Sequence, residues 1–511
     1  MCFIDFEKAY DNVSHELLFK KLEKLNIPKY LINTIKDIYK NTTMQVKIAG
    51  ETSSGYSYRK GVRQGCPCSP MLFNIFINDI FEGIEGVLIP KSNTKVPGLM
   101  FADDIIVFGN NLNDLASKVR KISKWAVDNR MRINCRKSGV LEWSVHSDAP
   151  VNRSLLSIPT DFGDIEEVTE YRYLGVLITR NTLEEHIVND AAMRGKKALD
   201  TLMPKLVSNC IPITFKAILV KCVLVPTLMY GSELWGMSST RAGKINRILR
   251  KSLRLIFKRV LVPLDRLMDE FKIERIHIQA ALSRYRTYNK WKHNKTIISD
   301  IISINPKERK TTWCSRTQRW LKRFVGNDYE TSDSRLITAK IIDVLRSRRT
   351  LNSSVAASIA DKYGILDSQI KYVLQKVNNR KIRTYTRLRC NLVKWSTRMA
   401  ASNRIPILYK NRCYLCDGPL ENLEHCLIEC PLLTETRNQY AEKLRILQCT
   451  ITSNQDKVKF ILGNKKRLKH NPEKIDELCT CIEFVNKIIV NRAILIQNKL
   501  CDINHNNQTN E

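Results

Sequence analysis

Hydrophobic residues in the N-terminal part of the chain recur with two different periods, and the helical period is the clearer one. Apolar positions return every three to four residues in 15–25, 29–39 and 114–127, as on one face of an amphipathic helix. Pro28 stands just before the second segment, where proline favours the start of a helix. The pattern therefore predicts three amphipathic helices.

Strand-like segments lie between these helices. Residues 44–49 are predicted to form a strand that ends in a turn at 50–55. Residues 99–108 are predicted to form a hairpin with Asp103 and Asp104 at its tip. Strands and helices mixed in this way predict an α+β domain, with an antiparallel sheet and helices on one of its faces.

A fourth helix start is marked by Ser69-Pro70. A capping hydroxyl followed by a proline at the first helical position is a strong start signal. The helix that it opens carries a stripe of apolar residues at helical spacing, which is expected to face the core. The stripe consists of Leu72, Phe73, Phe76, Ile77, Ile80, Phe81 and Ile84.

From about residue 182 the pattern is helical almost throughout. Most of the predicted helices have a basic face, and they cover 182–203, 212–229, 239–260, 275–291 and 367–378. The polar end of the chain, 504–511, is predicted to be disordered.

Charge changes this picture more than overall composition does. The 511 residues are 43% apolar and 26% charged, which is ordinary for a globular protein of several domains. Lys and Arg number 84 against 51 acidic residues, giving a formal net charge of +33. Such an excess favours a polyanionic partner, because neutralising phosphates releases counterions. A basic soluble protein without such a partner is the alternative.

The sequence predicts an intracellular protein, in the nucleus, the cytoplasm or both, that is not secreted and does not contact a membrane. Asp5 stands where a signal peptide needs apolar residues, and the best apolar run, 211–230, is interrupted by Lys216 and Lys221. Most of the 16 cysteines are scattered, with one cluster at 413–430. A reduced chain with one metal site explains that distribution better than a disulfide framework.

Three carboxylates stand in apolar surroundings. Asp5 follows Phe3-Ile4, and Asp103-Asp104 interrupt the apolar run of the predicted hairpin. Desolvating an unpaired carboxylate costs on the order of several kcal/mol, and adjacent aspartates also repel each other. A cation site is one interpretation of the pair, and a solvated acidic turn is the other.

Five short motifs follow one another in order along the first 180 residues. They are Asp5-Phe6-Glu7-Lys8-Ala9-Tyr10-Asp11, Arg63-Gln64-Gly65-Cys66-Pro67-Cys68-Ser69-Pro70, Phe101-Ala102-Asp103-Asp104, Asn134-Cys135-Arg136-Lys137 and Tyr173-Leu174-Gly175. The ordered set resembles the palm motifs of reverse transcriptases, and Asp11 and His15 fit the non-LTR retrotransposon and group II intron forms. Residues 224–235 resemble the thumb of non-LTR elements, which favours that branch.

The resemblance implies a role for each motif. Asp5 and Asp103 would hold two magnesium ions, with Asp104 completing the acidic cluster and the carbonyl of Phe6 joining the ion on the nucleotide side. Two such ions can activate a primer 3′-hydroxyl and stabilise the leaving pyrophosphate. The primer grip would be formed by Tyr173, Leu174 and Gly175.

The remaining motif residues would contact the substrates. Tyr10 would be the steric gate that excludes a ribose 2′-hydroxyl, while Gln64 and Gly65 would lie against the incoming nucleotide and the template. Lys137 would protonate the pyrophosphate. Plain alternatives stay open: Tyr10 as a core aromatic residue, Gln64 as a turn residue and Lys137 as a solvated lysine.

A cysteine cluster near the C-terminus has the spacing of zinc ligands. Its members are Cys413, Cys416, His425 and Cys430, with Cys426 as the alternative to His425. The cluster resembles the C-terminal zinc knuckle of many non-LTR polymerases, which implies one structural zinc ion. Unrelated buried cysteines are the alternative. The basic, aromatic segment 381–395 is expected either to contact RNA or to be a solvated helix face.

These expectations combine into one architecture. A reverse transcriptase palm would occupy 1–180, followed by an all-α thumb (181–300), a basic helical connector (301–400), a CCHC zinc knuckle (401–445) and a helical C-terminal region with a disordered tail (446–511). The resemblance implies an RNA-directed DNA polymerase that uses template RNA, a DNA primer and dNTPs.

The sequence departs from the family at its start. Reverse transcriptases place basic fingers upstream of the first aspartate, whereas only four residues precede Asp5. We therefore expect an N-terminally truncated chain with impaired polymerisation. The alternative function is a non-catalytic nucleic-acid-binding remnant. Tyr10 disfavours a viral RNA-directed RNA polymerase, which needs to accept the 2′-hydroxyl.

Overall fold

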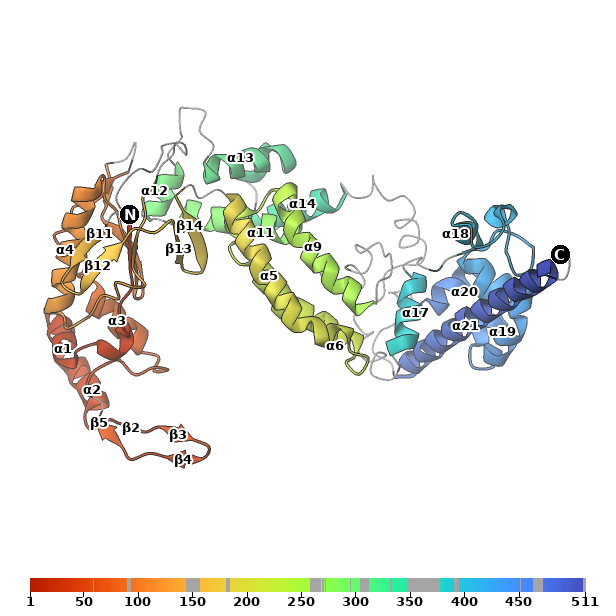
Figure 1. Cartoon of the computed structure of the whole chain (residues 1–511), viewed down its shortest axis with the longest axis horizontal. Helices are drawn as coiled ribbons and strands as arrows, with labels where there is room; N and C mark the ends of the chain where they lie inside the picture. Colours follow the sequence, from red (N-terminus) through yellow and green to blue (C-terminus); the bar gives the residue numbers. More distant parts are fainter. Residues whose placement is uncertain are drawn as a thin grey trace. The chain divides into compact units, whose positions relative to one another are not determined.

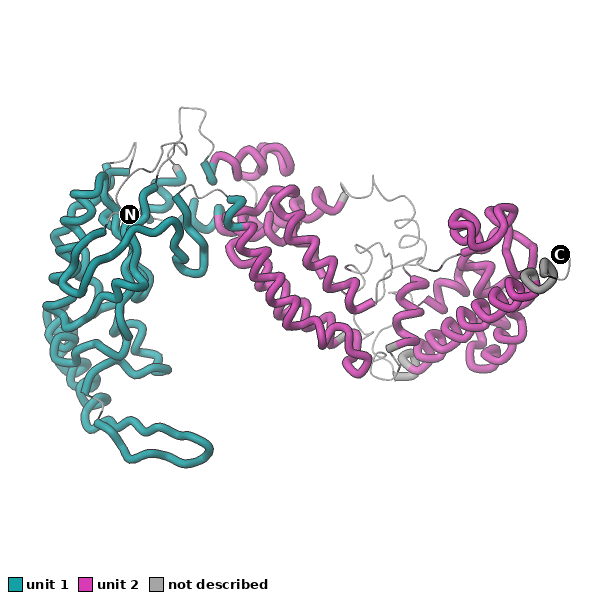
Figure 2. Tube along the Cα trace, viewed as in Figure 1, with its two compact units in different colours: residues 1–187, 288–314 teal, residues 188–287, 315–511 magenta. Residues whose placement is uncertain are grey.

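The computed structural model forms two compact units. One comprises residues 1–187 and 288–314, and the other residues 188–287 and 315–511 (Figure 2). The residues that the structure describes are 1–57, 59–89, 93–143, 157–180, 184–257, 268, 271, 273–294, 296–303, 312–330, 333–347, 377, 379–389, 393, 395–450, 452–462 and 472–508.

A four-stranded antiparallel sheet organises the first unit. Its strands run in the order β10 (Gly139–Val140), β1 (Cys2–Ile4), β9 (Asp104–Val107) and β8 (Gly98–Phe101). β1 is paired on both sides, because Phe3 lies opposite Ile106 of β9 and Gly139 of β10. The first strand of the chain is therefore an inner strand of the sheet.

Helices cover one face of this sheet. Successive side chains of a strand point to opposite faces, and Cys2 and Ile4 of β1 belong to the main hydrophobic core. The same core contains the buried apolar residues of α1 (His15–Lys24), α2 (Lys29–Tyr39), α3 (Ser69–Ile77) and α4 (Leu112–Asp128). Phe3 points the other way, into a smaller cluster with Ile106 and Leu141. The arrangement agrees with the α+β domain that the hydrophobic pattern predicts.

A hairpin packs on the face that the helices leave open. Its strands are β13 (Glu170–Tyr173) and β14 (Val176–Thr179). The ring of Tyr171 stacks on Phe3 with centroids 4.2 Å apart and planes at 8°, and the ring of Tyr173 lies 5.9 Å from Phe3. The hairpin is thereby fixed over β1.

The other strands form small ribbons. These are β2 (Thr43–Met44) with β5 (Tyr56–Ser57), β3 (Lys47–Ile48) with β4 (Glu51–Thr52), β6 (Val87–Leu88) with β7 (Lys95–Val96), and β11 (Ser157–Thr160) with β12 (Gly163–Glu166). The prediction of one strand over 44–49 followed by a turn at 50–55 is wrong in detail, because β2 and β3 are separate and β4 lies in the predicted turn. Both strands are exposed, so no buried face imposes one continuous register (Figure 1).

The start of α3 also differs from the prediction. Ser69 is the first helical residue, and Cys68 is the N-cap residue without a side-chain cap. The Ser69 hydroxyl donates instead to the carbonyl of Arg63, at 2.6 Å. The α-helix ends at Ile77, before the predicted stripe does, although Ile84 beyond it is still buried.

From residue 184 onward all the described secondary-structure elements are helical. They include α5 (Glu184–Val207), α6 (Ile213–Leu219), α7 (Val225–Met229), α8 (Ser232–Trp235), α9 (Ser239–Ile256), α11 (Ile276–His293), α12 (Ile297–Ser303), α13 (Trp313–Phe324), α14 (Ser334–Ser347), α17 (Asn379–Arg389), α18 (Ser396–Ala400), α19 (Thr434–Ala441), α20 (Asn454–Ile461) and α21 (Pro472–Gln508). Of these described helices, none has the length and apolar character that crossing a bilayer requires.

Three predicted helical or disordered segments differ from the described structure or lie outside it. The predicted helix 212–229 contains a π-helical turn over Val220–Leu224, between α6 and α7. The predicted helix 367–378 lies outside the described residues, apart from Val377. The helix α21 is assigned up to Gln508 and so overlaps the end of the chain, 504–511, whose disorder stays a prediction.

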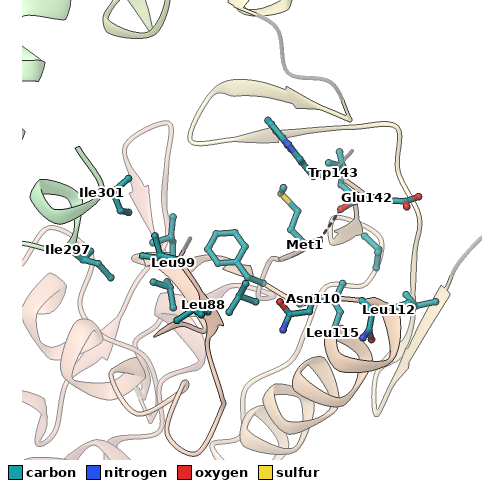
Figure 3. Close-up of a pocket in the computed structure, with 18 of the residues that line it drawn as sticks. Met1, Leu88, Leu99, Asn110, Leu112, Leu115, Glu142, Trp143, Ile297 and Ile301 are labelled. Carbon is teal, nitrogen blue, oxygen red and sulfur yellow. Dashed lines mark hydrogen bonds between the residues drawn. The ribbon is translucent and has the colours of Figure 1, made fainter. Parts of the chain in front are cut away.

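An apolar cavity of about 770 Å³ lies within the first unit (Figure 3). Met1, Leu99, Phe108 and Leu141 are among the residues that line it. Met1 and Phe108 lie at the start of β1 and the end of β9, whereas Asp5 and Asp104 lie at the opposite ends of the same strands. The cavity is therefore separate from the carboxylates.

Candidate functional site

Asp5 and Asp104 lie beside each other where two central strands meet. Asp5 directly follows β1, and Ile4 pairs with Ile105 of β9, so the antiparallel register sets Asp5 opposite Asp104. Both side chains leave the sheet on the face of Phe3, which the helices do not cover. Both aspartates are half-buried.

Asp103 reaches the same place through a tight turn. Phe101 pairs with Asp104, so Ala102 and Asp103 form a two-residue connection between β8 and β9. Ala102 has a φ of 54°, in the left-handed region that such turns use. The hairpin thus delivers two adjacent carboxylates to the end of β1.

Burial and neighbouring carboxylates disfavour the ionisation of Asp5 and Asp104. Burial raises the pKa of Asp5, Lys137 opposes this rise, and Asp103 adds to it. Burial also raises the pKa of Asp104, with further contributions from Asp103 and Asp5. Groups that affect one another in this way are close neighbours, and a cation between them would relieve their repulsion.

Oxygen ligands of this kind suit a hard divalent cation such as Mg²⁺. Within the described part of the chain, however, the three aspartates are not among the groups whose ligand atoms already gather around one point. Half-buried aspartate side chains can rotate, so they fit an ion after a local adjustment.

The turn at 134–138 holds the backbone of Asp5 on both sides. The N–H of Asn134 donates to the Asp5 carbonyl at 2.8 Å. The N–H of Asp5 donates to the Ser138 hydroxyl at 3.1 Å, and that hydroxyl donates to the Asn134 carbonyl at 2.9 Å. Lys137 belongs to the same turn, its side chain is exposed, and its charge lowers the pKa of Asp5.

Tyr10 lies between the core and the carboxylates. It belongs to a 3-10 turn over Ala9–Asn12, and its ring stacks on Phe73 with centroids 4.3 Å apart. Burial raises the pKa of its phenol, and Asp103 adds to the effect. The ring is therefore partly a core residue, while its hydroxyl lies within the field of the carboxylates.

The other predicted substrate contacts are held by backbone geometry. The bridge between Phe6 and Ile133 uses the carbonyl of Asp5 and the N–H of Glu7, so it leaves the Phe6 carbonyl out of this pairing. Gln64 is exposed, and its side-chain amide donates to Asp11 at 3.1 Å. Gly65 has a φ of 86°, a backbone conformation that a residue with a side chain adopts only with strain.

The predicted primer grip forms the turn of the β13–β14 hairpin. Leu174 and Gly175 have φ values of 47° and 74°, as in a two-residue hairpin turn. Burial raises the pKa of Tyr173, and Asp104 contributes, so this hairpin lies near the carboxylates.

Two further neighbours of the carboxylates are absent from the motif-based prediction. Burial raises the pKa of Tyr171 to about 12, and both Asp5 and Asp104 contribute. Its spacing of two residues from Tyr173 on a strand is a signal that could have identified it. Ser138 carries no comparable signal, since its role depends on a contact with a residue 133 positions away.

The C-terminal cysteine cluster comes together as one group. The ligand atoms of Cys413, Cys416, His425 and Cys430 all lie within 4.8 Å of one another. His425 Nε2 is 3.3 Å from the Sγ of Cys416, whereas its Nδ1 is 3.6 Å from a carboxylate oxygen of Glu429. His425 rather than Cys426 belongs to the cluster, which decides between the two alternatives.

The thiols of Cys413 and Cys430 share a hydrogen bond inside the cluster, at the place where a cation would bind. A hydrogen bond with Cys430 lowers the pKa of Cys413 to about 5, and the same contact raises the pKa of Cys430. Burial raises the pKa of Cys426, outside the cluster, to about 12. Three sulfurs and one imidazole nitrogen are a donor set that Zn²⁺ prefers.

A buried ion pair ties this cluster to α21. The carboxylate of Glu421 accepts hydrogen bonds from the guanidinium of Arg492, at 2.5 and 2.8 Å, and from the Ser396 hydroxyl, at 2.6 Å. Although burial acts to raise it, the pKa of Glu421 is lowered by these donors. The same Ser396 hydroxyl accepts the N–H of Tyr414, next to the first ligand, at 2.9 Å.

Comparison with known proteins gives one family and several relatives. Residues 1–178 match the family described as reverse transcriptase (RNA-dependent DNA polymerase). The chain is 25% identical over 264 residues to the Retrovirus-related Pol polyprotein from type-1 retrotransposable element R2 of Popillia japonica, covering 50% of this chain and 42% of that protein. It is 28% identical over 269 residues to the RNA-directed DNA polymerase from mobile element jockey of Drosophila funebris, covering 50% of this chain and 28% of that protein.

A third relative is the Transposon TX1 uncharacterized 149 kDa protein of Xenopus laevis. It is 29% identical over 182 residues, covering 34% of this chain and 13% of that protein. The chain thus spans less than half the length of each of these curated relatives.

Proposed function

Because residues 1–178 carry the reverse transcriptase domain of a non-LTR, LINE-type retrotransposon, we propose that this chain is an RNA-directed DNA polymerase that holds two magnesium ions with Asp5, Asp103 and Asp104. One observation carries the proposal. The register of β1 and β9 brings Asp5 opposite Asp104 on the open face of the sheet, and the adjoining turn adds Asp103.

The protein's own groups divide the work around this cluster. When bound, the ions would activate the primer 3′-hydroxyl and neutralise charge on the leaving pyrophosphate. Asp5 and Asp103 would hold them, Asp104 would complete the cluster, and the Phe6 carbonyl would add a ligand on the nucleotide side. Lys137 would supply a proton to the pyrophosphate.

Residues around the cluster would orient the substrates. Tyr10, held by its stack on Phe73, would exclude a ribose 2′-hydroxyl and so select dNTPs. Gln64 and Gly65 would lie against the nucleotide and template, where the bare backbone of glycine permits close approach. The primer grip of Tyr173, Leu174 and Gly175 would place the primer end on the open face.

The rest of the chain would bind nucleic acid and support the fold. We assign 1–180 to the palm, 181–300 to the thumb, 301–400 to a basic connector, 401–445 to the zinc knuckle and 446–511 to a helical C-terminal region. Cys413, Cys416, His425 and Cys430 would hold one structural zinc ion. The partners are template RNA, a DNA primer and dNTPs.

The test removes one carboxylate without changing its shape. Asp104→Asn should abolish primer extension on an RNA template, because the amide cannot replace a negatively charged ligand. Asp164→Asn, an exposed aspartate of β12, is the control with the same change of charge and should extend primers like the unchanged chain.

A second readout reports ion binding without polymerisation. Fe²⁺ bound in place of Mg²⁺ should, with ascorbate and peroxide, cleave the unchanged backbone near 103–104 and should not cleave the Asp104→Asn variant there. Undiminished extension by Asp104→Asn, or no cleavage at this turn in the unchanged chain, would contradict the proposal.

A further inference from the structure

The ladder between β1 and β10 changes its partners at Asp5. Met1 and Leu141 exchange two backbone hydrogen bonds, each 2.9 Å long, and Phe3 lies opposite Gly139. In an antiparallel ladder every second pair is hydrogen-bonded in this way, so the next such pair would be Asp5 with Lys137.

That pair is not formed, because the chain turns at 134–138. The N–H groups of Lys137 and Ser138 both bond to the carbonyl of Asn134, at 3.1 and 2.9 Å. The Ser138 hydroxyl accepts the Asp5 N–H in place of the Lys137 carbonyl, and the Asn134 N–H donates to the Asp5 carbonyl in place of the Lys137 N–H. The Ser138 hydroxyl and the Asn134 N–H thus make the two hydrogen bonds to the Asp5 backbone that Lys137 would make in a continuous ladder.

The Ser138 hydroxyl that replaces the Lys137 carbonyl as acceptor is buried. Ser138 is 5% exposed, and its hydroxyl makes two hydrogen bonds, one to each chain segment. A hydroxyl can accept from one group while donating to another, which an alanine cannot do. Without the hydroxyl, the Asp5 N–H would lose its acceptor at a half-buried position.

We infer that Ser138 is a positioning residue for the ion site: its hydroxyl fixes the backbone of Asp5 against the turn that carries Lys137. The inference rests on the proposed function, since Asp5 is taken to be an ion ligand. Ser138 itself contacts neither ion nor substrate in this proposal and acts only through Asp5. Loss of the hydroxyl should therefore weaken ion binding through the position of Asp5.

The chain offers a matched control. Ser123 is 0% exposed, and its hydroxyl likewise donates to one group, the Asp161 carboxylate, and accepts from another, the Asp161 N–H. It lies in α4 of the same unit and does not touch Asp5. Ser123→Ala and Ser138→Ala should therefore destabilise the chain similarly but differ at the ion site.

The experiment compares the full-length chain with Ser138→Ala, Ser138→Thr and Ser123→Ala. Ser138→Ala should raise the Fe²⁺ concentration for half-maximal cleavage near 103–104, and the Mg²⁺ concentration for half-maximal extension, by roughly three- to tenfold, the worth of one hydrogen bond. Ser138→Thr keeps the hydroxyl and should restore most of the loss. Ser123→Ala should leave both concentrations unchanged.

A readout without any ion completes the test. Amide hydrogen exchange at Asp5 should be faster in Ser138→Ala than in the unchanged chain, and Ser123→Ala should not accelerate it. If Ser138→Ala shifts the ion requirement no more than Ser123→Ala does, the positioning role is wrong.

The two proposals fail separately. If Asp104→Asn abolishes cleavage and extension while Ser138→Ala behaves normally, only the inference about Ser138 falls. If the unchanged chain shows no ion-dependent cleavage near 103–104, the ion site itself is wrong, and the positioning role falls with it.

Discussion

At the residue scale, the carboxylate of Asp104 is held among charges of its own sign. Burial and the neighbouring Asp103 and Asp5 all raise its pKa above the usual value of 3.8. A raised folded-state pKa means that the folded protein disfavours the ionised form. The associated stability is present below the unfolded-state pKa and is lost as the pH rises through the folded-state pKa.

The raised pKa of Asp104 predicts how the Asp104→Asn variant changes in stability. The neutral amide avoids the repulsion, so at pH 7 and without divalent ions the variant should be more stable than the unchanged chain, by about 0.5 kcal/mol because solvent screens a half-buried group. The gain should shrink as the pH falls toward 4, where the aspartate is protonated. Thermal unfolding at several pH values measures it, and a variant that is less stable at pH 7 would contradict the argument.

Single residues also show what the sequence can and cannot predict. Asp5, Asp103 and Asp104 could be singled out because carboxylates in apolar surroundings are conspicuous and because they stand in motifs that resemble those of reverse transcriptases. Ser138 could not, since its contact with Asp5 depends on where the turn at 134–138 ends and β10 begins. The sequence predicts that Ser69 caps α3, but it is the first residue of the helix, and its hydroxyl donates to the carbonyl of Arg63 instead of accepting from a backbone N–H.

At the element scale, the cysteine cluster depends on several short segments rather than on one regular element. A turn supplies Cys413 and Cys416, a π-helical turn supplies His425, and Cys430 follows that turn. Spacing alone left His425 and Cys426 equally possible, because both precede Cys430 by a few residues. The π-helical turn decides by directing His425 into the cluster and Cys426 into the core.

The prediction for the cysteine cluster compares the zinc content of two variants, each with one buried cysteine replaced. Cys413→Ser should lose the proposed zinc ion, because three ligands hold it less well than four. Cys426→Ser replaces a buried thiol outside the cluster and should keep one equivalent of zinc. Metal analysis of the purified variants, with a chromogenic chelator for release, measures both. Full zinc content in a Cys413, Cys416 and Cys430 triple serine variant would show that the cluster is not the site.

Sequence patterns predicted the helices of this chain better than its strands. The helices α2 and α9 could be located because their apolar faces are buried and repeat over several turns. The ribbon formed by β2 to β5 has exposed strands of two residues each, so alternation carries little information there.

At the scale of the whole molecule, part of the excess of positive charge lies on one face of α9. In α9, Arg247, Lys251 and Arg254 are exposed at helical spacing on one side, and Ile245 and Leu249 are buried on another. The sequence of α9 contains no acidic residue. A face of this kind suits the phosphate backbone of a nucleic acid.

The prediction is a change in salt dependence. Replacing Arg247, Lys251 and Arg254 with glutamine should weaken RNA binding and reduce the slope of log K against log salt by about 2, since each phosphate contact on a single strand contributes about 0.7. Binding is measured by fluorescence anisotropy over a series of salt concentrations.

The control variant also loses three positive charges, but these charges lie in ion pairs. Lys20, Lys24 and Lys36 are exposed in the first unit, and each lies within 4.0 Å of a glutamate. Their triple glutamine variant should change the slope much less, because these charges are already neutralised. Equal slopes for the α9 variant and the unchanged chain would exclude this face as a contact surface.

The double pairing of β1 has a consequence for how the protein is made. Residues 2–4 find their neighbours at 105–107 and 139–140, so the strand before Asp5 forms only through contacts that are distant along the chain. A growing polypeptide that has not reached Asn134 already contains all three aspartates, but it lacks the turn at 134–138 and the strand β10 that hold the first of them. Synthesis therefore completes the proposed ion site late, after most of this unit has left the ribosome.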